Sequence, residues 1–375
     1  MNRINLMKLR KIQEGRVKVW ISERDTYEAP IFFNPEAELN RDISVCALQT
    51  FQKKSKLKLN VLDALSATGI RGLRYTKEIS GIKSVTLNDK NSVAFKIIKK
   101  NIKENRLKKK CIATNKDANI LMRENVFNVI DLDPFGSPNI FMDSAARSIY
   151  HKGFLAVTAT DTAPLSGTYP EACFKKYGIK SIRSEFYPEL GIRILISFIM
   201  LILARYDRAF VPLLSLATRH YFRVFGKIEH VGRIKDLLKE FGYVNYCPTC
   251  GYRSLGKIES SHRYHIFRNC GPVYLGNIND RKFCKNVFKE LKKRKFRLKK
   301  EEERLLNFLV EESAMPAFYF DLHHVGKVLK IPIPKTEEVM RKLKKKGYRV
   351  SRTHFCLTAI KTDADFEKLK KIISQ

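Results

Sequence analysis

Short apolar runs alternate with amphipathic stretches between residues 59 and 228. The apolar runs predict strands at Leu59–Asp63, Val85–Asp89, Cys111–Thr114, Phe127–Asp131, Phe154–Thr158, Phe210–Ala217 and Tyr221–Ile228. The longer stretches predict helices over Ile70–Ile79, Ser92–Asn105 and Glu189–Arg205. Strands that alternate with helices indicate βαβ units and a parallel sheet, so the fold class is α/β.

The pattern changes after residue 228, which predicts a first domain over residues 1–228 and a smaller α+β domain over residues 229–375. Residues 281–300 contain 11 Lys or Arg and one acid, and an apolar stripe runs through them, so they predict a basic amphipathic helix. A further helix is predicted from Thr336 as N-cap to Gly347.

The charge of the chain points to a polyanionic partner. Lys and Arg total 72 against 38 Asp and Glu, a formal net charge of +34. A lysine-rich or thermophilic composition is the alternative, but thermophile surfaces usually gain Glu together with Lys. Nucleic acid is therefore the expected partner, and residues 229–375 are the expected binding domain.

Other features predict a soluble, cytoplasmic protein with no membrane contact, and none indicates a protein partner. Residues Met1–Lys8 lack the apolar segment of a signal peptide. The apolar run Ile194–Ala204 is too short to span a bilayer and predicts a buried helix. Eight Cys in 375 residues do not form a disulfide framework.

The loops that follow the first three strands predict an adenosine pocket. The first loop, Asp63–Gly72, contains small residues and Gly69, which let a ligand approach the backbone. Asp89 ends the second strand, where a carboxylate accepts from ribose hydroxyls, and Asp117–Ala118 follows the third, beside an adenine ring. Because the loop departs from Gly-x-Gly-x-x-Gly, S-adenosylmethionine fits better than a dinucleotide. A helix N-cap is the alternative role for Asp89.

The fourth strand leads into Asp131-Leu132-Asp133-Pro134-Phe135-Gly136-Ser137-Pro138. An exocyclic amine is a poor nucleophile, because its lone pair is delocalised into the base. Asp133 and the carbonyl of Pro134 are two acceptors that would turn the lone pair toward a methyl donor, and Phe135 offers a ring for a flipped base. The alternative is a simple turn at the end of a strand.

The chain resembles the tRNA (guanine(26)-N2)-dimethyltransferase family over nearly its whole length. The motifs are Asp133–Pro138, Glu14-Gly15, Phe32–Pro35, Asn40–Asp42, Asp63–Gly72, Asn88-Asp89, Tyr319–His323 and Ser351–Phe355. The resemblance implies a Rossmann-like class I methyltransferase domain with a smaller C-terminal domain. It also implies transfer of one and then two methyl groups to N2 of guanine 26, in an archaeal-type enzyme.

The same resemblance implies roles for individual residues. Arg41, Asp63, Gly69, Arg71, Asp89, Asp117 and Ala118 would bind S-adenosylmethionine; Asp133, Pro134 and Phe135 would be catalytic; and Phe32 and Phe135 would hold the base. The residues themselves do not choose guanine over adenine. Another RNA amino methyltransferase, acting on rRNA guanine or adenine, and a non-catalytic RNA-binding protein are the alternatives.

A single Cys-x-x-Cys pair suggests a metal site. Cys247 and Cys250 have the spacing of a zinc knuckle. The family often carries two such pairs, and here the second is missing. His262 and His265, or Cys270, would supply the remaining ligands, and the alternative is a remnant that holds no zinc.

Overall fold

The computed structural model describes residues 8–23, 31–218, 220–232, 234–262 and 265–374, so most of Met1–Lys8 lies outside the described residues. Its centre is a seven-stranded sheet. The strands, in spatial order, are β5 (Cys111–Thr114), β4 (Ile82–Asn88), β3 (Leu59–Asp63), β6 (Phe127–Leu132), β7 (Ile149–Ala159), β9 (Phe222–His230) and β8 (Arg208–Ala217). The first five are parallel, and β9 is antiparallel to both of its neighbours. The strand order reverses between β3 and β6, which is where ligands bind in open α/β sheets.

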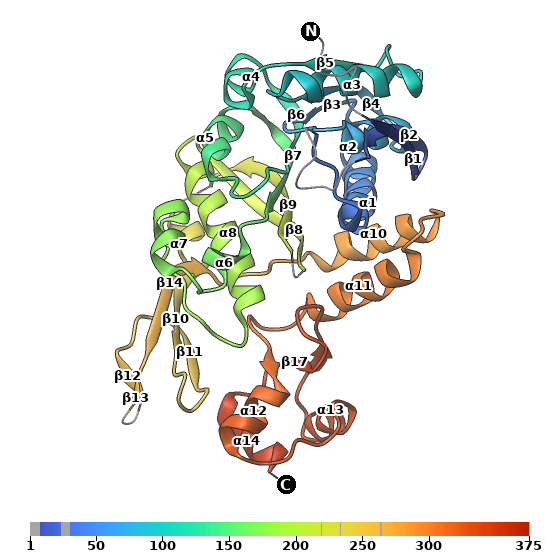
Figure 1. Cartoon of the computed structure of the whole chain (residues 1–375). Helices are drawn as coiled ribbons and strands as arrows, with labels where there is room; N and C mark the ends of the chain where they lie inside the picture. The colour runs from blue at the N-terminus through green and yellow to red at the C-terminus, as the bar shows by residue number, and fades with distance from the viewer. Residues whose placement is uncertain (1–7, 24–30, 219, 233, 263–264, 375) are drawn as a thin grey trace.

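Helices cover both faces of the sheet (Figure 1). Because successive strand residues point to opposite faces, Leu62 and Val157 pack with α4 (Ala118–Glu124), α5 (Asn139–Ser148) and α8 (Tyr187–Ala204). Val61 and Ala156 pack on the other face, with α1 (Glu38–Ser55), α2 (Ile70–Glu78), α3 (Ser92–Glu104) and α10 (Arg281–Lys292). The α/β class and the elements predicted between residues 59 and 228 are confirmed, with bounds that differ by a few residues.

The prediction of one basic helix over residues 281–300 is wrong in its extent. The chain forms α10 and then α11 (Lys299–Glu312), which pack against each other. Arg294 donates to the carbonyl oxygen of Glu78 at 2.8 Å, and Phe296 packs against the core, so residues 293–298 leave the helical path. The predicted N-cap is also shifted: α13 (Thr336–Lys345) is capped by Lys335, without a side-chain hydrogen bond.

The chain beyond the central sheet forms smaller units. The β1–β2 hairpin (Leu9–Glu14, Val17–Ser22) lies against α2 and α3. A three-stranded sheet and a hairpin form an arm. The sheet contains, in spatial order, β11 (Arg253–Gly256), β10 (Phe241–Tyr246) and β14 (Arg268–Tyr274), and the hairpin contains β12 (Ser261–His262) and β13 (His265–Ile266). The last unit has its own core and comprises β15 (Phe320–Asp321), α12 (Leu322–Leu329), α13, β16 (Val350–Arg352), β17 (Ala359–Thr362) and α14 (Phe366–Ile373).

Packing continues across the predicted domain boundary at residue 229. Val244 and Tyr274 of the arm share a core with α8, and Val287 of α10 shares a core with α1. Short elements complete the chain: η1 (Pro35–Ala37), α6 (Thr162–Leu165), α7 (Pro170–Tyr177) and α9 (Ile234–Leu238). The division at residue 229 therefore stays a prediction.

Helix α8 begins seven residues before the apolar run Ile194–Ala204 from which it was predicted. Over its 18 residues it has the length and composition to cross a membrane, but 67% of it is buried inside the protein. It packs between the sheet and the arm, as the prediction of a buried helix required.

Candidate active site

A cavity of about 450 Å³ lies at the carboxyl ends of β3, β4, β6 and β7. We refer to it as the Asp133 cavity. The turn after β6 forms one wall, and the loops after β3 and β4 form another. The structure thus brings the predicted residues Phe32 and Asp89, which are distant in the sequence, together with Asp133, Pro134 and Phe135.

The turn that carries Pro134 and Phe135 is fixed to the end of β7. The backbone N–H of Gly136 donates to Oγ1 of Thr160 at 2.6 Å, and the N–H of Thr160 donates back to the Gly136 carbonyl at 3.0 Å. Gly136 has a φ of +96°, which disfavours any side chain. The glycine lets the chain reverse and present Asp133 and Phe135 to the cavity.

Asp133 forms an ion pair with Arg71 at the inner wall of the cavity. The Arg71 guanidinium also donates to Oδ1 of Asn40 and to Oγ of Ser44, both at 3.0 Å. Arg71 is 5% exposed, whereas the Asp133 side chain keeps 27% of its surface exposed. The buried Arg71 therefore orients the Asp133 side chain, while part of the carboxylate faces the cavity.

A second carboxylate, Asp131, lies deeper in the same network. It accepts from Arg223 at 2.8 Å and from the hydroxyl of Tyr75, and Nη1 of Arg71 lies 3.8 Å away. Arg223 also bonds to Thr158, at the end of β7. Asp131 is 1% exposed, so it supports the network and does not reach the cavity.

The network sets the charge of its carboxyl groups. Burial opposes ionisation of Asp133, but the guanidinium groups of Arg71 and Arg223 outweigh it and hold the pKa of Asp133 below its usual value. Burial, together with the charge of Asp131, raises the pKa of Asp63 to about 7. Asp133 is thus a carboxylate at neutral pH, as an acceptor of N–H groups must be.

Two aromatic rings stand at the mouth of the cavity. Phe135 is 75% exposed and meets Phe32 edge to face, with ring centroids 5.6 Å apart. An apolar ring that is left this open is suited to stack on a nucleobase, worth about 1–3 kcal/mol. Both rings line the same cavity as Asp133, so a base stacked on one of them would lie in the cavity that the carboxylate faces.

Tyr221 lines the same cavity and was missed by the sequence reasoning. Its side chain is 7% exposed, and its hydroxyl has no hydrogen-bond partner among the described residues. Burial raises the pKa of Tyr221, so the hydroxyl stays neutral and is able to donate or accept. A buried polar group without a partner is costly, and a ligand in the cavity would satisfy it. Only the fold brings it near Asp133, so no sequence signal was available.

Asp89 lies on the opposite wall and orders the loop after β3. Its carboxylate accepts from the backbone N–H of Ala67 at 2.9 Å and from that of Asn91 at 2.8 Å. The N-cap of α3 is Asn91, so Asp89 does not have the alternative role of a helix cap. Each carboxylate oxygen retains a lone pair for a ribose hydroxyl.

The other predicted cofactor residues, Arg41, Asp63, Gly69, Asp117 and Ala118, do not line the Asp133 cavity. Arg41 is buried and pairs with Glu14, and Asp63 accepts from the N–H of Gly72 at 2.9 Å. Asp117 caps α4, Ala118 is buried at its start, and Gly69 precedes α2 with a φ of +79°. These residues shape the loops, and their contact with a cofactor stays a prediction.

The predicted metal ligands converge in part. Atoms of Cys247, Cys250 and His265 lie within 4.8 Å of one another, and Nδ1 of His265 is buried without a partner among the described residues. His262 instead stacks on Tyr252 with centroids 3.7 Å apart, and Cys270 is buried in β14. These three atoms are of the kinds that zinc binds, and a zinc site here stays a prediction.

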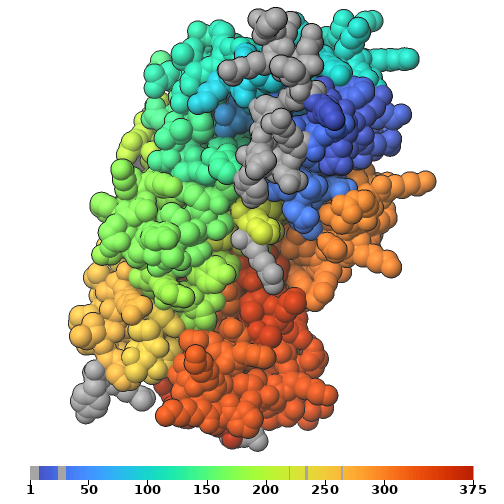
Figure 2. Space-filling view, in the orientation of Figure 1, coloured from blue at the N-terminus to red at the C-terminus, as the bar shows by residue number. Residues whose placement is uncertain are grey.

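A basic groove of about 380 Å³ runs between α1 and α10, on the other side of the molecule's core from the arm (Figure 2 shows α10 and α11 in orange). Its cationic residues are Lys53, Lys54, Lys282, Lys289 and Lys293. Glu290 also lines the groove and pairs with Lys53 and Lys293. The cations suited to phosphate groups are therefore Lys54, Lys282 and Lys289, as the charge of this stretch predicted.

Comparisons with known proteins identify close relatives. A family model described as N2,N2-dimethylguanosine tRNA methyltransferase matches residues 12–374. A tRNA (guanine(26)-N(2))-dimethyltransferase of Methanobrevibacter smithii is 38% identical over 378 residues, 98% of this chain and 97% of that protein. One from Pyrococcus horikoshii is 38% identical over 379 residues, 96% and 97% of the two chains. The solved complex of Trm1 from Pyrococcus horikoshii with S-adenosyl-L-methionine has a TM-score of 0.89 at 36% identity, covering 97% of this chain and 100% of that one.

Proposed function

The chain belongs to the N2,N2-dimethylguanosine tRNA methyltransferase family, and from this we infer that it methylates tRNA with S-adenosylmethionine. It transfers methyl groups to the exocyclic N2 of guanine at position 26 and forms N2,N2-dimethylguanosine. The observation that carries the assignment within this chain is Asp133, an ionised carboxylate that faces a cavity beside an open aromatic ring.

The chemistry follows from these groups. S-adenosylmethionine supplies an electrophilic methyl group. Asp133 accepts one N–H of the amine and the Pro134 carbonyl accepts the other, which turns the lone pair toward the donor. Phe135 and Phe32 hold the base, which must leave its helix to reach the cavity. Arg71 holds Asp133 in position throughout. After transfer, the acidic ammonium gives its proton to Asp133 or to water.

The decisive experiment is mass spectrometry of nucleosides from tRNA incubated with the enzyme and S-adenosylmethionine. We expect N2,N2-dimethylguanosine, preceded by the monomethyl product. Methyladenosine, or no methylated nucleoside in the tRNA, would contradict the assignment. A guanine-26-to-adenine tRNA is the matched control and should remain unmethylated.

The basic groove between α1 and α10 is suited to hold the phosphate backbone of the tRNA. Its lysines come from segments more than 200 residues apart, yet they line one surface. We assign tRNA binding to this groove together with the C-terminal residues 229–375. A cytoplasmic location follows from the tRNA substrate.

We also propose a zinc site at Cys247, Cys250 and His265. The unpartnered Nδ1 of His265 supports it. Metal analysis should find about one zinc per chain, reduced in Cys250→Ser and His265→Ala. His262→Ala, the matched control, should retain the metal. Zinc content that is unchanged in Cys250→Ser would rule out this ligand set.

A further inference from the structure

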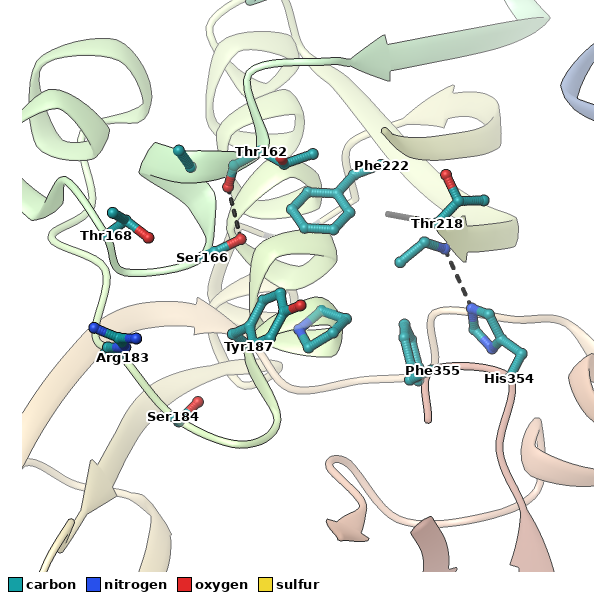
Figure 3. Close-up of a pocket in the computed structure, with 13 residues that line it drawn as sticks. Thr162, Ser166, Thr168, Arg183, Ser184, Tyr187, Thr218, Phe222, His354 and Phe355 are labelled. Carbon is teal, nitrogen blue, oxygen red and sulfur yellow. Dashed lines mark hydrogen bonds between the residues drawn. The ribbon is translucent and has the colours of Figure 1, made fainter. Parts of the chain in front are cut away.

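A second cavity, of about 630 Å³, lies where the N-terminal end of α8 meets the loop between β16 and β17 (Figure 3). We call it the His354 cavity. Residues from four separate segments line it, including Thr162, Ser184, Tyr187, Thr218, His354 and Phe355. The methyl transfer derived above uses none of them.

The His354 cavity adjoins the Asp133 cavity. Thr160 lines the Asp133 cavity, and Thr162 lines the His354 cavity. Tyr221 and Phe222 are divided between the two cavities in the same way. Two short segments therefore separate the cavities. A polynucleotide with one base in the first cavity has its next nucleotide within reach of the second.

The lining of the His354 cavity suits a phosphate and a ribose. Among the described residues, its lining includes Arg183 and several hydroxyl groups but no acid, unlike that of the Asp133 cavity. Arg183 is exposed, and its guanidinium has no ion-pair partner among the described residues. Ser184 is 8% exposed, and its hydroxyl has no hydrogen-bond partner in the described part of the chain. A ligand in the cavity would satisfy this hydroxyl.

Aromatic side chains in the cavity suit a base. Tyr187 is 44% exposed at the first turn of α8, and Figure 3 shows its ring and that of Phe355 within the cavity. Phe355 is held in place by the His354 ring, at a centroid distance of 3.8 Å. His354 is in turn fixed at both nitrogens, by the N–H of Ala217 at 3.3 Å and by the buried carboxylate of Glu312. His354 and Phe355 therefore form a wall held by these contacts, while Tyr187 is exposed.

We propose that the His354 cavity binds the nucleotide next to the methylated guanosine, with Arg183 and Ser184 on its sugar-phosphate and Tyr187 on its base. The inference rests on the proposed function, since it assumes that a guanosine of tRNA occupies the Asp133 cavity. It gives His354 and Phe355, in the loop after β16, a role in holding the substrate beside the reacting base.

The test combines variants of the full-length enzyme with tRNA transcripts that carry one abasic residue directly 5′ or 3′ of guanosine 26. On intact tRNA, Tyr187→Ala should raise KM about tenfold by loss of a stacked base. On the transcript that lacks the bound base, Tyr187→Ala should add nothing further. Tyr150→Ala, 51% exposed at the start of β7, is the matched control and should leave KM unchanged.

A second variant gives an independent readout. Arg183→Ala should lower the slope of log KM against log salt by about one, as expected for one lost phosphate contact. An unchanged KM for Tyr187→Ala on intact tRNA, or an equal rise on all transcripts, would overturn the proposal. Failure of the wild-type enzyme to form N2,N2-dimethylguanosine on intact tRNA would instead contradict the proposed function, so the two failures are distinguishable.

Discussion

Two arginines one turn apart on α2 anchor two ionic networks, of which one reaches a cavity and the other is enclosed in the protein. Arg71 pairs with Asp133 and lies near Asp131, whereas Arg74 pairs with Glu14, Asp42 and Glu78. Both arginines are buried, at 5% and 0% exposure. We refer to them as the open and the closed network, because only the first reaches a cavity.

The difference lies in the carboxylates. Asp133 keeps 27% of its side chain exposed, whereas Glu14 keeps 5%, and Asp42 and Glu78 keep 1% each. Burial beside the carboxyl group of Asp42 raises the pKa of Glu302 to about 10, so a neutral acid lies next to the closed network. We therefore infer that the open network serves catalysis, because one of its carboxylates faces the cavity. The closed network serves stability, because none of its carboxylates does.

The largest expected effect is on the open network. Asp133→Ala removes the acceptor, so single-turnover methyl transfer should fall by about 10²–10⁴-fold. The affinity for tRNA should remain within about threefold, because phosphates supply most of it. Filter binding and nucleoside analysis measure the two quantities on the same preparation. A variant with near wild-type turnover would refute the role given to Asp133.

The closed network should respond in stability. Glu14→Gln leaves Arg41 and Arg74 without their shared anion, and breaking a buried pair costs about 3–5 kcal/mol of unfolding free energy. The charges of Arg41 and Arg74 outweigh burial and lower the pKa of Glu14. The stability that Glu14 contributes is thus present above its usual pKa and lost as the pH falls below it. Urea unfolding should show this acid loss in wild type but not in the variant, and Glu171→Gln, an exposed site, is the control.

The pH dependence of stability gives a further test of the open network, because the charge of Asp131 helps to raise the pKa of Asp63. Its pKa is raised from 3.8 to about 7, so stability is lost as the pH rises through this interval. At 1.36 kcal/mol per unit, the loss is at most roughly 4 kcal/mol. Asp63→Asn still accepts from Gly72 and should remove most of this loss. Parallel pH–stability curves for the two proteins would show that Asp63 does not titrate there.

The smallest effect is expected on the surface of α10. Reversing Lys282 and Lys289 to Glu should reduce the salt slope of tRNA binding by about two, or roughly 0.9 per phosphate contact. The fold should be unaffected, because both side chains are exposed. The matched control is the reversal of Lys108 and Lys109, exposed lysines near β5, which changes the net charge equally. Equal slopes in both double variants would move the binding face elsewhere.

The sequence was a good guide where the signal was local. Strands β3 to β9 follow from apolar runs, and α2 and α3 follow from their periodicity. Tertiary contacts decided the rest. The helix predicted over residues 281–300 stops at Lys292, because Arg294 and Phe296 bind to the body of the protein. No local pattern contains those partners.

The site shows the same limit. Asp89, Asp133, Pro134 and Phe135 were predicted because each follows a strand, and strand ends converge at the edge of a sheet. Tyr221 and Arg223 lie about 90 residues further along and reach the site through the antiparallel strand β9. The ion pair of Arg71 with Asp133 was also unforeseen, since the resemblance implied only a cofactor contact for Arg71.

The most direct test of the two-network account is a side-by-side measurement of Asp133→Ala and Glu14→Gln on one tRNA. Single-turnover rates and urea unfolding are measured at a temperature where both variants are folded. The account predicts a crossing: Asp133→Ala is at least about a hundredfold slower than Glu14→Gln, whereas Glu14→Gln is the less stable by several kcal/mol. If Glu14→Gln were both the slower and the less stable variant, the separation of chemistry from stability on α2 would be wrong.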